Sequence, residues 1–315
     1  MSEYVSASGD VIVSPRLAAV VVTYNSAEVL GGCLRSLAKQ ETPLIAVVVA
    51  DNASSDGTRR IAENFTELPM QVVNLGRNGG FSAGINAGIA ALDLSRLDAV
   101  LVLNPDCQVL PRALTVLASA LRRTGCGIVV PRLVNPDGSL QPSLRRKPTV
   151  TRALVESLLP GGVAGRLGPF SEFILNPRAY ERPGVTAWAT GAAMLISVPA
   201  LLEIGEWDES FLLYSEETDY CLRAADHGWC TWYEPDACVE HIGGDSESMP
   251  KFASLQTVNR VLLFRRRHNR LHSAAYFAAV ALGQGIRAAL GRSTSRASVA
   301  ALLKPSRRVR ELATC

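Results

Sequence analysis

The 315-residue sequence predicts an α/β fold with a mostly parallel, Rossmann-like central sheet flanked by helices. Three observations predict it. Apolar runs typical of strands that are buried on both faces alternate with helical segments over residues 16–130. Polar residues or glycines follow the ends of these runs. Residues 251–315 carry 13 basic residues and one acidic residue, which predicts a basic helical C-terminal extension beyond the sheet.

The elements of residues 16–130 alternate in a regular order. Strands are expected at 17–23, 44–50, 71–75, 99–103 and 128–130. Helices are expected between them at 27–39, 56–65, 82–92 and 111–123. This spacing favours right-handed βαβ units and therefore neighbouring strands that run parallel.

The remaining chain is less regular. Residues 131–185 are rich in Pro, Gly and Arg and are expected to form loops, with a turn at 135–138. Strand patterns are expected within 185–198 and at 230–233 and 238–241, and helices at 199–204, 216–227 and from 249 onward. We therefore expect an N-terminal extension (1–15), a main domain with two halves (16–130 and 131–250) and the basic region 251–315.

The cysteines and the chain termini suggest a location. The seven cysteines are odd in number and irregularly spaced, and no C-x-x-C occurs, so a disulfide framework or zinc site is not expected. A reducing cytoplasm fits this pattern, and residues 1–15 do not resemble a secretory signal. The uncharged stretch 271–286 is shorter than the roughly 20 apolar residues of a membrane span, so we expect it to lie on a membrane instead of crossing it.

Polar groups follow four of the predicted strands, where open parallel sheets bind their ligands. Asp51 and Asp106 are the carboxylates among them, and Asn104 precedes Asp106 by two residues. Neighbouring carboxylates repel unless a cation lies between them, and Mg²⁺ prefers such oxygen ligands. The competing explanation is that Asn, Asp and Gly simply form the turns that follow every strand. Neither a Walker A motif nor G-x-G-x-x-G is present, which disfavours an ATPase or a nicotinamide enzyme.

A second acidic cluster, Glu216, Glu217 and Asp219, follows Ser215, which is expected to cap a helix. One explanation is that these acids only complement the helix dipole, which favours negative charge in the first turn. Alternatively, the flanking aromatic residues desolvate one carboxylate and raise its pKa, which would suit a general base. His241, at the end of a predicted strand, is a candidate metal ligand or base.

These residues lie in motifs that resemble the inverting glycosyltransferases of family 2, which have the GT-A fold, and in particular their rhamnosyltransferase-like branch. The motifs are 19–25 (AVVVTYN), 50–57 (ADNASSDG), 78–86 (NGGFSAGIN), 104–106 (NPD), 190–196 (TGAAMLI), 207–209 (WDE), 216–219 (EETD) and 235–237 (PDA) with His241. The resemblance covers about residues 17–245. It implies that 16–130 is a nucleotide-binding half and 131–250 an acceptor and catalytic half.

The resemblance also implies roles for single residues. Glu217 would be the catalytic base, with Glu216 and Asp219 as rivals, and Asp106 and His241 would hold Mg²⁺ or Mn²⁺. The nucleotide-sugar donor would be bound by Thr23, Tyr24, Asn25, Asp51, Asn78, Gly80, Asn104 and Asp106. Trp188 and Gly191 would bind the acceptor. Arg145 and Arg146 are added as acceptor residues from their charge alone, which suits an acceptor diphosphate. Asn104 replaces the first Asp of the family's Asp-x-Asp motif and removes one charge from the metal site.

The function implied is transfer of rhamnose or a related deoxysugar from a dTDP- or UDP-sugar to a hydroxyl group. The acceptor would be a glycan or a polyprenyl-diphosphate-linked sugar in cell-envelope polysaccharide synthesis. The basic region 251–315 suits an anionic membrane surface, and no nucleic-acid-binding motif accompanies its charge. We therefore expect a cytoplasmic protein that is peripheral on the inner face of the plasma membrane.

Two alternatives remain open at this point. Residues 80–84 (GFSAG) match G-x-S-x-G, so Ser82, Asp219 and His241 could form an α/β-hydrolase triad. Against this, Ser82 does not directly follow a predicted strand. The other alternative is a non-catalytic protein that binds nucleotide sugars, which the Asn at position 104 favours.

Overall fold

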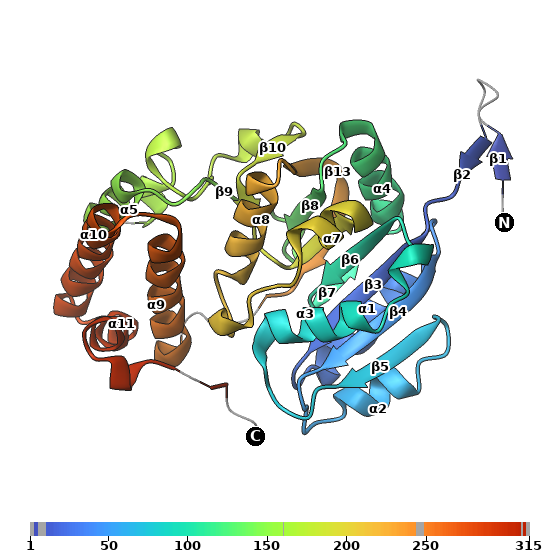
Figure 1. Cartoon of the computed structure of the whole chain (residues 1–315), viewed down its shortest axis with the longest axis horizontal. Coiled ribbons are helices and arrows are strands. Elements are labelled where there is room, and N and C mark those ends of the chain that lie inside the picture. Colours follow the sequence, from blue (N-terminus) through green and yellow to red (C-terminus); the bar gives the residue numbers. More distant parts are fainter. Residues whose placement is uncertain (1–2, 6–10, 160, 244–248, 310, 313–315) are drawn as a thin grey trace.

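The computed structural model describes residues 3–5, 11–159, 161–243, 249–309 and 311–312. Its centre is a single mixed sheet with helices on both faces (Figure 1). The C-terminal helices α9 (Pro250–Arg267), α10 (Arg270–Ala289) and α11 (Ser293–Leu303) form a group beside it (Figure 1). The α/β class and the mostly parallel sheet are confirmed.

The sheet has the order β10-β13-β8-β12-β6-β3-β4-β5, and β7 pairs with β13. Its parallel strands are β3 (Leu17–Thr23), β4 (Leu44–Asp51), β5 (Met70–Asn74), β6 (Ala99–Leu103), β8 (Ile128–Val134) and β13 (Thr231–His241). The antiparallel ones are β7 (Cys107–Val109), β10 (Gly184–Thr186) and β12 (Ala193–Ser197), the last of which separates β6 from β8. Because β3 pairs with both β4 and β6, the strand order reverses beside β3, and a crevice for ligands is expected there.

Alternate residues of β3 face two separate hydrophobic cores. One core contains residues of α1 (Ala27–Ala38), α2 (Thr58–Glu63) and α4 (Ala113–Thr124). The other contains residues of α3 (Gly80–Ala90), α7 (Val198–Ile204) and α8 (Glu216–Asp226). Glycines bring α3 unusually close to the sheet, since a Cβ on Gly84 or Gly88 would lie 2.4 or 2.3 Å from a valine methyl of β3. The glycine-rich segment before α3 is thereby held against the strand ends.

Residues 131–185 are more ordered than predicted. They contain β9 (Leu144–Arg145), which pairs with β11 (Trp188–Ala189), and two helices, α5 (Val150–Leu158) and α6 (Gly161–Ala164). The prediction of loops alone is therefore wrong for α5, whose nine residues are too few for a clear periodicity. It is stabilised by tertiary contacts, since Ala153 packs against α10 and the Ser157 hydroxyl donates to Ala279 O at 2.6 Å.

The C-terminal region is helical as predicted: α9 (Pro250–Arg267), α10 (Arg270–Ala289) and α11 (Ser293–Leu303) share a small core with α5. Over the described part of the chain, none of the helices combines the length and the apolar character that crossing a bilayer requires. One further prediction needs correction. Instead of two strands at 230–233 and 238–241, the chain forms one strand, Thr231–His241, with an irregularity between Glu234 and Cys238. In the N-terminal extension, β1 (Glu3–Val5) pairs antiparallel with β2 (Val11–Val13).

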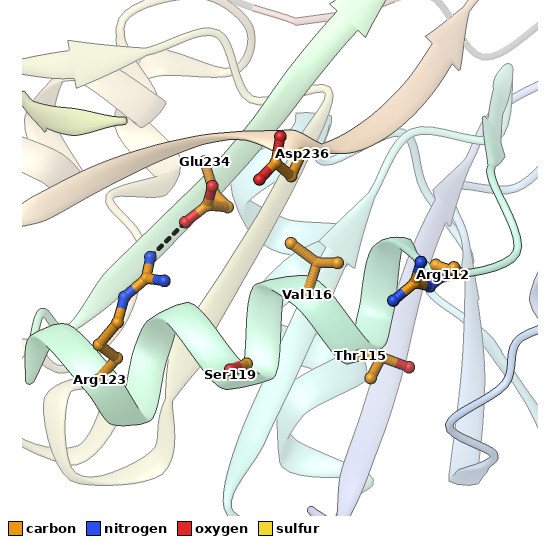
Figure 2. Close-up of a pocket in the computed structure, with 7 residues that line it drawn as sticks. All are labelled: Arg112, Thr115, Val116, Ser119, Arg123, Glu234 and Asp236. Atoms are coloured by element: carbon orange, nitrogen blue, oxygen red, sulfur yellow. Dashed lines mark hydrogen bonds and ion pairs between the residues drawn. The ribbon is translucent and has the colours of Figure 1, made fainter. Parts of the chain in front are cut away.

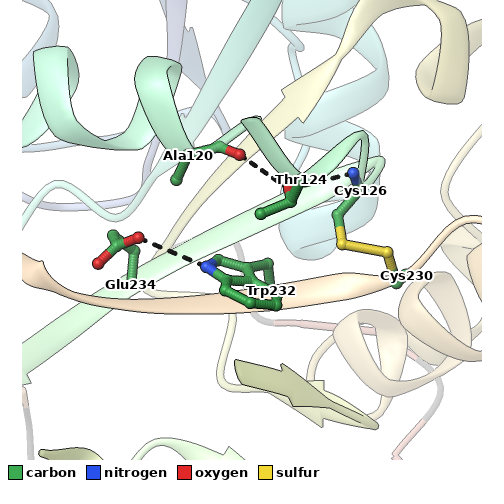
Figure 3. The surroundings of a disulfide bond; sticks show 6 residues. All are labelled: Ala120, Thr124, Cys126, Cys230, Trp232 and Glu234. Atoms are coloured by element: carbon green, nitrogen blue, oxygen red, sulfur yellow. Dashed lines mark hydrogen bonds between the residues drawn. A yellow bond between two sulfur atoms is a disulfide. The ribbon is translucent and has the colours of Figure 1, made fainter. Parts of the chain in front are cut away.

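Cys126 and Cys230 form a disulfide, which the irregular cysteine spacing did not predict (Figure 3). The reason is topological. Cys126 lies two residues before β8 and Cys230 directly precedes β13, and Ile128 of β8 lies opposite Thr231 of β13 in parallel register. The two Cα atoms are consequently 4.7 Å apart although 104 residues separate them in the chain.

Candidate active site

The carboxyl ends of β3 and β4 form one side of the candidate site. Thr23 and Asp51 lie opposite each other in the parallel ladder, and the Thr23 hydroxyl donates to Asp51 Oδ1 at 2.9 Å. Asp51 is buried and also accepts the Ser54 amide at 3.0 Å. Asn25 has a left-handed backbone and its Oδ1 accepts the Ser55 amide at 2.9 Å. The predicted donor residues Thr23, Asn25 and Asp51 therefore come together, with the partly buried Tyr24 between them.

The glycine-rich segment is tied to the same strand end. Asn52 Oδ1 accepts the Gly79 amide at 3.1 Å, and Asn78 Oδ1 accepts the Gly80 amide at 3.2 Å. Asn78 and Gly80 are thus placed beside Asp51, as predicted for one binding edge. The buried Asn52 was missed as a separate contributor, although it directly follows Asp51 in the chain.

Asp106 and His241 lie together because β7 pairs with the end of β13, with His241 opposite Cys107. The His241 Nε2 atom is 3.4 Å from Asp106 Oδ1 and 3.4 Å from Asn104 Nδ2. Within the described residues, Asp106 Oδ1 is buried and has no hydrogen-bond donor. An acceptor oxygen and a ring nitrogen that face each other in this way are suited to share a cation.

Gln141 determines which nitrogen of His241 is available. Its Nε2 donates to Asn135 Oδ1 at 3.0 Å and to the His241 carbonyl at 3.3 Å, so its Oε1 must be the atom 2.7 Å from His241 Nδ1. Nδ1 therefore carries a proton, and Nε2 is the ring nitrogen that faces Asp106. Gln141 was missed by the sequence analysis, because it lies in the region predicted as loops.

The ligand atoms of Asp106, Cys107 and His241 all lie within 4.8 Å of one another. Burial raises the pKa of the Cys107 thiol well above its ordinary value, and its sulfur donates to Ala192 O at 3.3 Å. The thiol stays protonated, so the Asp106 carboxylate and the His241 imidazole remain as possible metal ligands. This donor set fits Mg²⁺ or Mn²⁺.

Glu217 lies next to Gly191. A Cβ on Gly191 would lie 3.4 Å from Glu217 Cβ and 3.2 Å from the Phe81 ring. The next residue, Ala192, accepts the Asn104 amide at 2.9 Å. Both acidic clusters, which are far apart in the sequence, therefore lie next to the same short segment, Gly191–Ala192.

Glu217 also lines a cavity of about 220 Å³. The cavity walls include the predicted acceptor residues Arg145 and Trp188, and also Glu172, Phe173, Tyr214 and Arg260. The Arg145 guanidinium lies 4.6 Å from the centre of the Phe173 ring. Arg146 is not among the residues that line this cavity, but its guanidinium donates to Ser171 O at 3.0 Å and to the carbonyl of the lining residue Phe173 at 3.2 Å. Trp188 is held in place by its Nε1, which donates to Arg146 O at 3.0 Å.

Glu172 and Arg260 were not predicted, because one lies in presumed loops and the other in the C-terminal extension. Arg260 Nη2 lies 3.4 Å from carboxylate oxygens of both Glu156 and Glu172. Burial raises the pKa of Glu172 to about 7, although Arg260 opposes the shift. Helix α9 is thereby joined to the cavity by a buried network of charges.

The rivals of Glu217 differ from it in their surroundings. Glu216 is 4% exposed, and its burial and the neighbouring Glu217 raise its pKa well above the ordinary value. Asp219 Oδ2 accepts from Arg223 Nε at 2.7 Å. Ser215 has a left-handed backbone and its side chain makes no capping bond, so the prediction that Ser215 caps α8 is wrong.

The hydrolase alternative is not supported. Ser82 lies within α3 and is buried, and its hydroxyl has no hydrogen-bond partner among the described residues. Asp219 is paired with Arg223, and His241 is placed between Gln141 and Asp106. The three residues of the supposed triad therefore do not meet.

A second hollow, of about 510 Å³, lies between α4 and β13 (Figure 2). Its wall includes an ion pair of 2.6 Å between Arg123 and Glu234, with Asp236 beside it. It contains none of the residues predicted for the site, so the cavity at Glu217 remains the candidate.

Comparison with known proteins identifies the family of the chain. Residues 18–175 match the model of the family described as glycosyl transferase family 2. The chain is 33% identical over 245 residues to an N-acetylglucosaminyl-diphospho-decaprenol L-rhamnosyltransferase of Mycobacterium tuberculosis, covering 71% of this chain and 75% of that protein. It is 30% identical over 209 residues to the low-salt glycan biosynthesis hexosyltransferase Agl10 of Haloferax volcanii, covering 66% of this chain and 61% of that one.

Solved structures agree on the fold. The mannosyltransferase PcManGT of Pyrobaculum calidifontis, in complex with GDP-Man and Mn²⁺, aligns with a TM-score of 0.55 at 19% identity over 94% of this chain and 83% of that one. Staphylococcus aureus TarS 1-349 in complex with UDP aligns with a TM-score of 0.52 at 19% identity over 90% and 74%. These neighbours confirm the GT-A fold. The family match and the mycobacterial relative show that the chain belongs to glycosyl transferase family 2.

Proposed function

We propose that this protein transfers rhamnose or a related deoxysugar from a dTDP- or UDP-sugar to a hydroxyl group of a polyprenyl-diphosphate-linked sugar or glycan. Synthesis of cell-envelope polysaccharide is the corresponding process. The observation that carries the proposal is that an Asp–His ion site and a carboxylate-lined cavity both lie next to the Gly191–Ala192 segment. The mycobacterial relative, an L-rhamnosyltransferase by name, supports the choice of sugar and of a lipid-linked acceptor.

The strand ends would bind the donor. Thr23, Tyr24, Asn25 and Asp51 would bind the base and ribose, with Asp51 fixed by Thr23 and Ser54. The glycine-rich turn at Asn78 and Gly80 and the segment 104–106 would surround the diphosphate. A divalent cation, Mg²⁺ or Mn²⁺, would be held by Asp106 and His241 Nε2, and when bound it neutralises negative charge that develops on the leaving diphosphate.

Glu217 is the residue that we assign as base. Its carboxylate would accept the proton of the acceptor hydroxyl while the hydroxyl oxygen bonds to the anomeric carbon and the bond to the diphosphate oxygen breaks. A single displacement inverts the configuration at that carbon. Glu217 is favoured over its rivals because it is among the residues that line the cavity, whereas Glu216 and Asp219 are not, and Asp219 is paired with Arg223.

The cavity around Glu217 suits an acceptor with a sugar and a diphosphate. Trp188, Phe173 and Tyr214 offer aromatic surface for a sugar ring, and Arg145 and Arg260 offer positive charge. Gly191 leaves room beside Glu217 that a side chain would fill. Arg146 would act indirectly, through the wall that holds Trp188.

The C-terminal helices would bring the enzyme to its lipid-linked acceptor at the inner face of the plasma membrane. Leu271 of α10 and Leu290 just after it are 78% and 77% exposed, and the exposed Arg292 lies near Leu290 in the chain. Exposed apolar and basic side chains together suit an anionic bilayer surface. Flotation with phosphatidylglycerol vesicles should weaken in a Leu271→Ser/Leu290→Ser variant, and unchanged flotation would exclude this role.

The central experiment is a transfer assay with dTDP-rhamnose and N-acetylglucosaminyl-diphospho-polyprenol, with and without Mg²⁺ or Mn²⁺. Glu217→Gln should lower turnover by about 1,000-fold while donor affinity, measured by calorimetry, stays nearly constant. Glu181→Gln, on the exposed surface, is the matched control. Normal turnover by Glu217→Gln would remove Glu217 as base. Donor binding without any transfer by the wild type would favour the non-catalytic alternative.

A further inference from the structure

The segment that leads to Glu217 has an unfavourable backbone. Leu212, Tyr214 and Ser215 all have positive φ, at 61°, 69° and 77°, and none of them is glycine, asparagine or aspartate. At Leu212 the chain makes a tight γ-turn, in which the Leu213 amide donates to Phe211 O at 2.7 Å. Side chains with a Cβ disfavour this region of φ, so the segment 212–215 needs contacts from outside to keep its shape.

Asn259 of α9 provides such contacts. Its side chain is buried, and its Nδ2 lies within hydrogen-bonding distance of three carbonyls of the segment: Phe211 O at 2.6 Å, Leu213 O at 2.9 Å and Tyr214 O at 3.1 Å. Carbonyl oxygens only accept, so the atom facing them must be the amide nitrogen. Two amide hydrogens shared among three carbonyls satisfy buried acceptors that the strained turn leaves without partners from regular secondary structure.

Helix α3 holds the same segment from the opposite direction. The Phe81 amide donates to Leu212 O at 3.0 Å. Gly80 makes this approach possible, because a Cβ there would lie only 1.9 Å from Leu212 O. The segment is therefore fixed between the start of α3 and the middle of α9.

From these contacts we propose that Asn259 is a positioning residue, which holds the segment 212–215 in its strained form and so orients Glu217 toward the cavity. The inference rests on the proposed function of Glu217 as base. It gives the C-terminal region a role in catalysis that is separate from membrane binding. Asn259 itself lines neither the cavity nor the ion site in the described structure, so its effect must pass through the segment.

The test compares Asn259→Ala and Asn259→Asp with Thr257→Val. The Asp variant keeps the shape of the side chain but loses the amide donors. Thr257 is a buried polar residue of the same helix, and its hydroxyl bonds to Ala253 O and Ser298, away from the segment. Both Asn259 variants should lower kcat by about 10- to 100-fold with the donor KM changed by less than about 3-fold, because the base is misplaced while the donor edge is intact. Thr257→Val should retain the wild-type kcat.

A double variant separates this role from a merely structural one. If Asn259 acts through Glu217, Asn259→Ala should have little further effect in a Glu217→Gln background. Multiplicative losses in the double variant, or a wild-type kcat in both Asn259 variants, would overturn the inference and leave the proposed function intact. Full activity of Glu217→Gln alone would instead refute the base assignment on which the inference depends.

Hydrogen exchange gives a readout that needs no substrate. Peptides spanning residues 211–219 should exchange faster in Asn259→Ala than in the wild type. In Thr257→Val they should exchange at the wild-type rate. Equal exchange in the wild type and both Asn259 variants would show that the amide does not hold the segment, whatever the turnover.

Discussion

The donor edge lies at the ends of β3, β4 and β6, where two non-glycine residues, Asn25 and Ala53, have positive φ. The segment 212–217 contains three such residues, Leu212, Tyr214 and Ser215, and belongs to no strand. At the donor edge, Thr23 and Asp51 are neighbours because their strands pair in register. In the segment 212–217, the position of Glu217 depends on Asn259 and on Gly80, which are remote in sequence. The first region is built by sheet geometry and the second by tertiary contacts.

The two regions should respond differently to amino-acid substitutions. Residues at strand ends are supported by the most deeply buried part of the core, so a substitution there should remove one chemical group and little else. The segment 212–217 has no such support of its own. Substitutions far from Glu217 in sequence should therefore affect catalysis through it.

Asp106→Asn should give the largest effect and tests the donor edge. The change removes a carboxylate from the ion site but keeps the shape of the side chain, so transfer should fall by about 1,000-fold with the fold intact. Calorimetric titration with Mn²⁺ should show weaker binding by the variant. Asp236→Asn, an exposed acid on the same strand as His241, is the control. Mn²⁺ affinity equal to that of the wild type would contradict the assignment of Asp106.

Gly80→Ala should give the next largest effect, because it acts where the two regions meet. Its new methyl group would collide with Leu212 O, and φ at Gly80 is +87°, so we expect a loss of about 3 kcal/mol in the free energy of unfolding. Transfer should fall by about 100-fold as the segment moves. Gly76→Ala is the matched control, since Gly76 also has a positive φ but open space around it. Chemical denaturation of both variants measures the difference, and equal losses would show that the contact with Leu212 is unimportant.

The same contrast explains what could be predicted from the sequence. The strands at 17–23 and 99–103 have the predicted bounds, because a continuous apolar run is a local signal. Asp106 and His241 were expected to meet from the resemblance, and they do. By contrast, nothing local marks Leu212, Tyr214 and Ser215 as left-handed, since glycine or asparagine would be the usual signal.

The acceptor side was less predictable for the same physical reason. Helix α5 is short and depends on α10 for its packing, and Arg260 reaches the cavity from a helix that follows the sheet domain in sequence. The disulfide between Cys126 and Cys230 likewise depends on which strands become neighbours. Periodicity and composition contain no information about such pairings, whereas they do determine buried strands and the turns that end them.

Glu172→Gln should give the smallest effect, and it tests whether the acceptor side depends on the C-terminal helices. Burial raises the pKa of Glu172 to about 7, so in the folded protein this carboxyl keeps its proton at pH values where the unfolded chain has lost it. The stabilising contribution is complete below the ordinary pKa of a glutamate and is lost as the pH rises toward 7. The wild type should therefore lose at most about 3 kcal/mol of unfolding free energy over this interval from Glu172.

Glutamine resembles the protonated form, so Glu172→Gln should flatten the dependence of stability on pH between about 4.5 and 7. Urea denaturation at several pH values measures the slope, and the exposed Glu181→Gln should leave it unchanged. An unaltered slope in Glu172→Gln would mean that Arg260 keeps this carboxylate ionised. The contact between Arg260 of α9 and Glu172 would then be an ordinary ion pair at all these pH values. The stability of the acceptor side would in that case not depend on the protonation of Glu172.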